Sequence, residues 1–302
     1  MSHICHAPLI LYIIAFFFLQ AVIGTHFFSP ANVMPLLENV HGEKTAPETI
    51  ATAMAMGKRL GKKTVLAGNC FGFIGNRLIE SYGREAIYML EEGLSPSGVD
   101  GPMRGFGMPM GPLQMSDLAG NDIGYNIRKE LFPTKPTTGR YHGTLADKLV
   151  EAGRLGQKVK KGWYDYSAGR APVEDPFVAA LLESRRAALG LTVRALDAQE
   201  VRDRCLLPMV NEGFKCIQEG IALRESDIDI VLVFGYGFPA WRGGLMHWSR
   251  HGREGGLPKL LSDMRRLSRA HPSVAHWNPC KRLVKEVAAL QEGRQSSRQS
   301  RL

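Results

Sequence analysis

The chain reads GTHFFSP at residues 24–30 and LLENV at residues 36–40. Each is a short run of apolar and aromatic residues close to a turn residue, which is typical of a β-strand. Thr45 and Glu48 have the spacing of a capping box and predict that a helix begins there. Residues 64–67 predict a third strand. The order strand, strand, helix, strand indicates a small portion of an α/β domain, which is expected to expose apolar surface.

Most of the remaining sequence predicts helices. Apolar residues recur every four positions from Ile74 to Leu90, so they form one face of a long helix that ends at Gly93. Shorter helices are expected over residues 99–106 and 146–153. Residues 167–174 resemble a linker, and Asp175-Pro176 has the cap and first-turn proline of a further helix.

Part of the helical pattern occurs twice. Asp203-Arg204 follows Asn76-Arg77 at an offset of 127 residues (203 minus 76), and GYGFP at 235–239 answers GFGMP at 105–109. The shared order predicts two tandem helical domains of common ancestry, so the fold class is predicted to be mainly α.

The amino-acid composition limits the classes of protein to which the chain can belong. An apolar fraction of 44% with 22% charged residues is typical of a globular protein. The formal net charge of +9 is spread along the chain, unlike the basic stripe of a nucleic-acid binder, and suits either plain solvation or a phosphorylated ligand. The five cysteines are widely spaced with no CxxC pair, which indicates neither a metal site nor a disulfide framework.

His26 and Glu38 lie on neighbouring predicted strands. Histidine is the usual general base near neutral pH, and a carboxylate partner fixes its tautomer and stabilises its protonated form. The alternative is that His26 packs within its strand and Glu38 is a solvated strand residue. Spacing alone leaves both interpretations open.

Four motifs resemble those of the 3-hydroxyacyl-CoA dehydrogenase family, and the resemblance extends from about Val22 to the C-terminus. The motifs are Gly24–Pro30 with Met34 and Leu37-Glu38, Gly72–Arg77, Gly107–Pro112 with Ser116–Gly120, and Gly153–Gln157 with Lys161–Tyr164. The last motif is similar to that of the peroxisomal members. The resemblance implies an α/β remnant of a Rossmann-type dinucleotide-binding domain at residues 23–67, followed by helical domains at 68–170 and 175–290.

The resemblance also implies roles for individual residues. His26 would take the proton of the 3-hydroxyl of an acyl-CoA while NAD accepts the hydride, Glu38 would orient His26, and Asn76 would hydrogen-bond the substrate. In the second copy Asp203 replaces Asn76, so that copy is expected to be structural. A loop would line the acyl pocket, or alternatively form a core-packing turn; it consists of Met108, Pro109, Met110, Gly111 and Pro112.

Three departures from the family pattern affect the expected activity. The G-x-G-x-x-G turn that holds the phosphates of NAD has no counterpart in this sequence, and Cys5 falls near the place of the family's substrate-binding serine. Lys160 stands where a glycine is expected, which costs a turn conformation. The expectation is a truncated fatty acid β-oxidation dehydrogenase that is inactive alone. The alternatives are an acyl-CoA-binding or dimerisation module, or a membrane-anchored fragment.

The two ends make opposite predictions about location. Residues 1–22 form a leader outside the family pattern, and the apolar run at residues 7–24 suggests a membrane span, a secretion signal or a non-native start. Residues 291–302 read as a flexible tail that ends in Ser300-Arg301-Leu302, which is similar to the address read by the peroxisomal import receptor. A peroxisomal enzyme is therefore expected, with homo-oligomer contacts through the helical domains as a further hypothesis.

Overall fold

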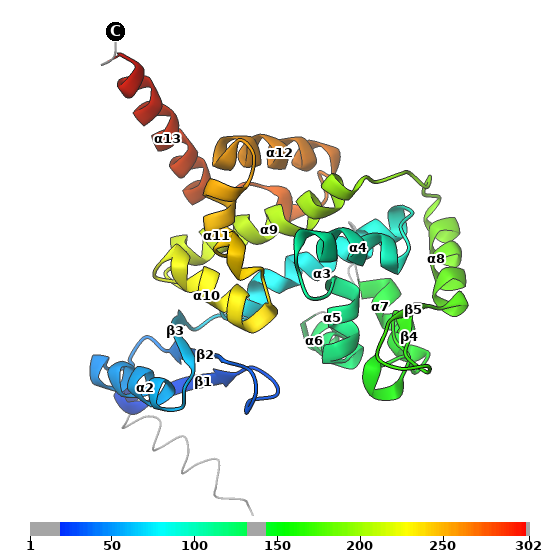
Figure 1. The fold of residues 1–302 in the computed structure, drawn as a ribbon, viewed down its shortest axis with the longest axis horizontal. Helices are drawn as coiled ribbons and strands as arrows, with labels where there is room; N and C mark the ends of the chain where they lie inside the picture. The colour runs from blue at the N-terminus through cyan, green and yellow to red at the C-terminus, as the bar shows by residue number, and fades with distance from the viewer. Residues whose placement is uncertain (1–18, 132–142, 300–302) are drawn as a thin grey trace, which may run out of the picture. The chain divides into compact units, whose positions relative to one another are not determined.

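A computed structural model describes residues 19–131 and 143–299 (Figure 1). Most of the apolar run at the N-terminus and the tripeptide Ser300–Leu302 lie outside the described residues. The chain divides into two compact units, and each is described by itself. The first contains the residues up to Arg77 together with Gly213–Arg253, and the second contains Leu78–Glu212 together with the residues after Arg253.

The first unit contains a three-stranded sheet of order β1-β2-β3. Strand β1 (Ile23–Phe27) is antiparallel to β2 (Leu36–His41), which is parallel to β3 (Lys63–Gly68). Helix α2 (Pro47–Arg59) connects the two parallel strands. These four elements confirm the sequence prediction.

Both faces of the central strand β2 are covered by helices. Leu37 faces α2, where a Cβ at Gly57 would lie 3.0 Å from its Cδ2 atom. Leu36 points to the other face, because side chains alternate along a strand, and there a Cβ at Gly235 of α10 (Glu225–Tyr236) would lie 2.7 Å from its Cδ2 atom. The expectation of an uncovered face is therefore wrong for β2, because α10, which is distant in sequence, supplies the second layer.

The start of α2 differs from the predicted capping box. The N-cap residue is Ala46, and the side chain of Thr45 does not cap the helix. Its hydroxyl accepts a hydrogen bond from the backbone N–H of Gly42 and donates one to the carbonyl oxygen of Val22. Thr45 therefore fastens the loop before the helix, and Pro47 begins the first turn as predicted.

The remaining elements are mostly helices. In the first unit they are η1 (Leu19–Ala21), η3 (Ala240–Arg242), α11 (Leu245–His247) and η4 (Trp248–Gly252). Helix α3 (Gly75–Glu92) starts in the first unit, and α9 (Ala198–Gln218) ends in it. The second unit further contains α4 (Pro96–Phe106), α5 (Pro112–Ala119), α6 (Asn121–Leu131), α7 (Gly143–Glu151), η2 (Gln157–Val159), β4 (Tyr164–Asp165), β5 (Val173–Glu174), α8 (Pro176–Leu189), α12 (Gly256–Ala270), η5 (Ala275–Trp277) and α13 (Lys281–Gln299).

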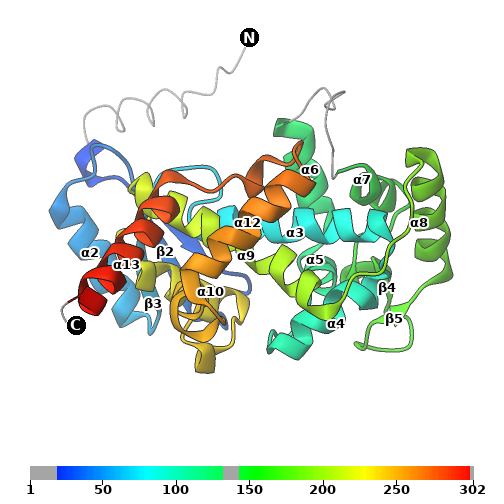
Figure 2. The same ribbon diagram turned by 90° about the horizontal axis from the view of Figure 1, so that it is seen from above.

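In the second unit α3 and α9 lie side by side, and α12 contacts α13 (Figure 2). The predicted long helix and its end before Gly93 are confirmed. Asp175 caps α8 by accepting a hydrogen bond from the N–H of Phe177, also as predicted. The predicted linker at 167–174 is partly wrong, because Val173–Glu174 forms β5 and pairs with β4.

The same hydrogen-bond arrangement occurs once in each unit. Asp100 on α4 accepts hydrogen bonds from two successive backbone N–H groups near the start of α5, those of Leu113 and Gln114. Asp229 on α10 does the same for Met246 and His247 of α11. In both cases a carboxylate on an earlier helix stabilises the start of a later helix.

The described residues contain neither a membrane-spanning helix nor a cluster of metal-binding side chains. No helix among them has the length and apolarity needed to cross a membrane. Within the same ranges, no cluster of three or more His, Cys, Asp or Glu side chains is placed to hold a metal ion.

Candidate functional site

His26 and Glu38 are brought together by the register of the sheet. They lie directly opposite each other on β1 and β2, and Nδ1 of His26 lies 2.8 Å from Oε2 of Glu38. Glu38 is fully buried, while the His26 side chain is 29% exposed. An ionised carboxylate can only accept a hydrogen bond, so Nδ1 carries the proton and the lone pair of Nε2 is left available. This is the geometry of a general base.

The other oxygen of Glu38 is held by the start of α3. Oε1 accepts hydrogen bonds from the backbone N–H groups of Ile74, at 3.1 Å, and Gly75, at 3.0 Å. N–H groups at a helix N-terminus have no partner within the helix and carry partial positive charge. They offset the cost of burying the carboxylate, so Glu38 can stay charged without contact with water.

The turn that leads into α3 has a strained backbone. Gly72 has φ of 78°, and Phe73 has φ of 48°, which is unusual for a residue with a side chain. The ring centroid of Phe73 lies 5.5 Å from that of His26. Strained residues of this kind are often found at functional sites, because the surroundings hold them for a purpose other than stability.

Asn76 lies one residue after Gly75, so the start of α3 brings all three predicted catalytic residues into one unit. Its side chain is exposed, and its Oδ1 atom accepts a hydrogen bond of 2.7 Å from the hydroxyl of Tyr236. Sequence reasoning did not identify Tyr236 as a site residue. The available signal was its position in the repeated GYGFP motif, but a contact across 160 positions is not visible in a sequence.

The predicted acyl-pocket loop belongs to the second unit. Met108, Gly111 and Pro112 are buried, whereas Pro109 is exposed and Met110 is partly exposed. A Cβ at Gly111 would lie 2.4 Å from the Cα of Asp100, so this glycine is required for close packing. The buried members therefore have a packing role, and a substrate role for the loop stays a prediction.

Two of the recognised motifs meet at Asp117. This carboxylate is buried and accepts hydrogen bonds from the backbone N–H groups of Trp163 and Tyr164 and from the hydroxyl of Tyr166. Burial raises its pKa, while these donors and Asn121 act in the opposite direction. The motifs around residues 116–120 and 161–164 therefore hold the second unit together.

The starts of α2 and α3 do not fit the phosphates of NAD. A phosphate site at a helix N-terminus needs free N–H groups and no negative charge. Helix α2 begins with Pro47, which has no N–H, and has the acidic Glu48 in its first turn. The N–H groups of Ile74 and Gly75 at the start of α3 are already bonded to Glu38. The chemistry that these residues define is therefore the proton and substrate side of a reaction.

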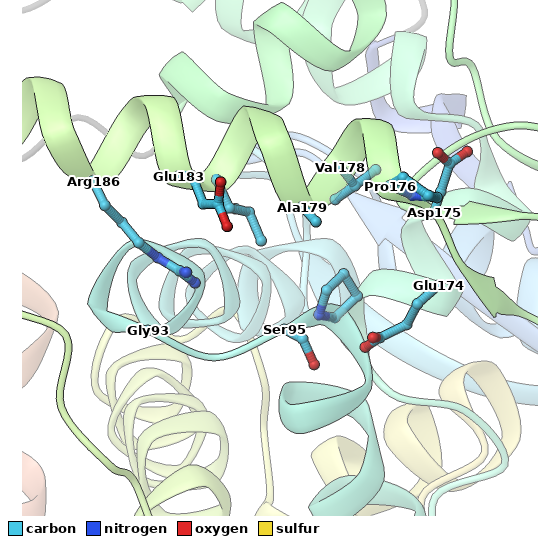
Figure 3. A pocket seen from close by; sticks show the side chains of 11 residues that line it. Gly93, Ser95, Glu174, Asp175, Pro176, Val178, Ala179, Glu183 and Arg186 are labelled. Atoms are coloured by element: carbon cyan, nitrogen blue, oxygen red, sulfur yellow. The ribbon is translucent and has the colours of Figure 1, made fainter.

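A pocket of about 310 Å³ in the second unit does not suit a CoA ester either (Figure 3). Glu174, Asp175 and Glu183 line it and would repel phosphates. Its one cation, Arg186, donates hydrogen bonds to the carbonyl oxygens of Leu90 and Leu94.

Comparison with known proteins indicates the family of the chain. The sequence model of the 3-hydroxyacyl-CoA dehydrogenase NAD binding domain matches residues 19–70, and that of the C-terminal domain matches residues 72–166. Both models describe domains of one dehydrogenase family, and the first of them is described as NAD binding. The chain belongs to the 3-hydroxyacyl-CoA dehydrogenase family.

Several curated relatives are peroxisomal enzymes. The chain is 42% identical over 281 residues to the peroxisomal bifunctional enzyme of Danio rerio, covering 89% of the chain and 39% of the relative. It is 40% identical over 276 residues to the human enzyme of the same name, covering 87% of the chain and 38% of that relative. The chain thus spans about two fifths of the length of these relatives.

Two solved structures are similar to this chain. The dehydrogenase part of multifunctional enzyme 1 from C. elegans is 30% identical with a TM-score of 0.64, covering 87% of this chain and 59% of that one. The 3-hydroxybutyryl-CoA dehydrogenase of Escherichia coli has a TM-score of 0.69 at 24% identity, covering 91% of this chain and 71% of that one. At that identity the second likeness concerns the fold alone.

Proposed function

We propose that the chain provides the general base and the acyl-CoA-binding residues of an NAD-dependent (S)-3-hydroxyacyl-CoA dehydrogenase of fatty acid β-oxidation. The observation that carries this proposal is the 2.8 Å contact between His26 and the buried Glu38. Nε2 of His26 takes the proton of the substrate 3-hydroxyl, and the charge of Glu38 stabilises the imidazolium that forms. Asn76 donates a hydrogen bond from Nδ2 to a substrate oxygen.

The oxidant of this family is NAD, which accepts a hydride from C3 of the substrate when it is bound. Because the starts of α2 and α3 offer its phosphates no site, the proposed roles concern the proton and the substrate only. The starts of α2 and α3 also favour a second candidate function, because neither has free N–H groups for a phosphate. In that function the chain binds acyl-CoA but does not oxidise it.

The proposed domain organisation follows the sequence pattern. Residues 23–67 are a remnant of a Rossmann-type domain, and residues 68–170 and 175–290 are homologous helical domains. The matching contacts of Asp100 and Asp229 support the duplication, since each carboxylate bonds two N–H groups at the next helix start. Helices α4 and α10 also both end at a left-handed glycine, Gly107 and Gly237.

The proposed location is the peroxisome, through binding of Ser300–Leu302 to the import receptor. The peroxisomal relatives support it. A fluorescent protein fused in front of the chain should enter peroxisomes, and the same fusion without the last three residues should stay outside. Equal import of both fusions would contradict the receptor assignment.

The activity is tested by two measurements on the same preparation. The first is reduction of acetoacetyl-CoA by NADH, and the second is calorimetric titration with acetoacetyl-CoA. NADH consumption that His26→Gln lowers by about 10²–10⁴-fold would support the general base. Acyl-CoA binding that Asn76→Ala weakens, without turnover, would support the second candidate. Neither binding nor turnover would overturn both.

A further inference from the structure

Tyr236 connects the end of α10 to the candidate site. Its hydroxyl donates a hydrogen bond of 2.7 Å to Oδ1 of Asn76. We propose that Tyr236 is a positioning residue that fixes the amide of Asn76 with its Nδ2 donor turned to the substrate. This inference rests on the proposed function, because it assigns a partner to the residue proposed to bind the substrate oxygen.

The ring of Tyr236 is fixed by the residues of the first unit around the base. It meets Phe28 edge to face, with ring centroids 5.3 Å apart, and the centroid of Phe28 lies 5.0 Å from that of His26. Gly75 allows the close approach, because a Cβ there would lie 2.9 Å from the Tyr236 hydroxyl oxygen. The same Gly75 donates its N–H to Glu38. Tyr236 is therefore built into the site that holds the base.

The hydroxyl of Tyr236 acts as a donor across the working pH range. Burial raises its pKa, and the charge of Glu38 raises it further. An amide group has one accepting oxygen and one NH₂ group, so an oxygen that accepts from Tyr236 leaves the NH₂ group to face the open side. The side chain of Asn76 is exposed, and without this bond both orientations of the amide are accessible.

Removal of the hydroxyl separates positioning from packing, since Tyr236→Phe retains the ring. We expect this variant to bind acetoacetyl-CoA about tenfold more weakly, the effect of one hydrogen bond. In Tyr236→Phe/Asn76→Ala the loss should equal that of Asn76→Ala alone, because the hydroxyl acts through the amide. Tyr82→Phe is the matched control: that hydroxyl is buried and bonds to no described residue, so its removal should leave the affinity unchanged.

A second readout does not depend on substrate. The side-chain ¹H–¹⁵N resonances of Asn76 should move in Tyr236→Phe and stay in place in Tyr82→Phe. Unchanged affinity in Tyr236→Phe, or a loss that adds to that of Asn76→Ala, would overturn the positioning role. If the wild-type chain binds no acyl-CoA, the proposed function fails. In that case, Asn76 resonances that stay in place in Tyr236→Phe would also refute the hydrogen bond between Tyr236 and Asn76. Resonances that move would support this bond.

Discussion

Glu38 determines which nitrogen of His26 carries the proton. Its two oxygens are used differently: Oε1 accepts from the backbone N–H groups of Ile74 and Gly75, and Oε2 faces Nδ1 of His26. Since backbone N–H groups can only donate, Oε1 must remain an acceptor in any variant that keeps the fold. The chemical nature of the other terminal atom therefore decides the tautomer of His26.

Glu38→Gln should invert that tautomer while retaining the fold. The amide oxygen would stay with the two N–H groups, so the amide NH₂ group would donate to Nδ1 and the proton of His26 would move to Nε2. A protonated Nε2 cannot accept the substrate proton, and we expect any turnover to fall by about 10²-fold or more. The ¹⁵N shifts of the imidazole report the tautomer directly. Glu219→Gln is the control, because Glu219 bonds to Arg77 and not to His26; Nδ1–H in the Glu38 variant would contradict the prediction.

At the scale of elements, the turn after η2 contains a residue in an unfavourable backbone conformation, as the sequence predicts. Lys160 follows η2 with φ of 60°, the left-handed conformation that glycine adopts without penalty. The predicted cost of a lysine at this position is thereby confirmed in its geometry. Lys160→Gly should raise the free energy of unfolding by about 0.5–1 kcal/mol. Denaturant unfolding measures it, and Lys160→Ala, which removes the charge but keeps the Cβ, should show no gain. An equal gain in both variants would assign the effect to charge.

The paired helix caps predict how stability depends on pH. Burial raises the pKa of Asp100 and that of Asp229 from 3.8 to about 6. Between about pH 4 and 6 the folded protein then binds more protons than the unfolded chain. The stability that these two carboxyl groups contribute is therefore fully present below pH 3.8 and is lost as pH rises through 6. Unfolding midpoints in urea should be higher at pH 5 than at pH 7.5.

Asp100→Asn tests the source of this dependence. Its share of the change in stability between pH 5 and pH 7.5, on the order of 1 kcal/mol, should disappear. Asp122→Asn is the control, because the pKa of Asp122 is lowered, first by its bond to Lys158, and that carboxylate titrates below the tested range. A pH slope in Asp100→Asn equal to that of the wild type would show that other groups cause the effect.

The elements also show how far sequence reasoning reaches. The strands, the long helix and the facing of His26 and Glu38 follow from periodicity, turn residues and strand register, which are local properties. The cover that α10 gives to Leu36 was not predicted, because nearly two hundred residues separate them. The contact of Tyr236 with Asn76 was missed for the same reason. The capping role of Thr45 was mispredicted because its hydroxyl has better-placed partners in the preceding loop.

At the scale of the whole molecule, the two units depend on different interactions. The first is organised around a sheet whose central strand carries the buried apolar residues Leu36, Leu37 and Val40. The second contains a buried ionic network, in which Arg204 has no solvent exposure and bonds to Glu85 and Glu92. Nε2 of His276 lies 2.6 Å from the other oxygen of Glu85. Burial alone would raise the pKa of Glu85, but Arg204 and His276 together lower it.

Loss of the central cation should therefore destabilise the second unit far more than loss of a surface pair. Arg204→Met removes the cation that Glu85 and Glu92 share and leaves His276 beside Glu85 and Arg194 beside Glu92. We expect a loss of about 3–5 kcal/mol in the free energy of unfolding. Arg84→Met, which removes the neighbouring and more exposed pair with Glu80, should cost under about 1 kcal/mol. Urea unfolding followed by tryptophan fluorescence measures both. Adding Glu85→Gln to Arg204→Met should recover part of the loss, because the buried negative charge of Glu85 is then removed. No recovery would mean that the packing of the Arg204 side chain, and not its charge, supports the second unit.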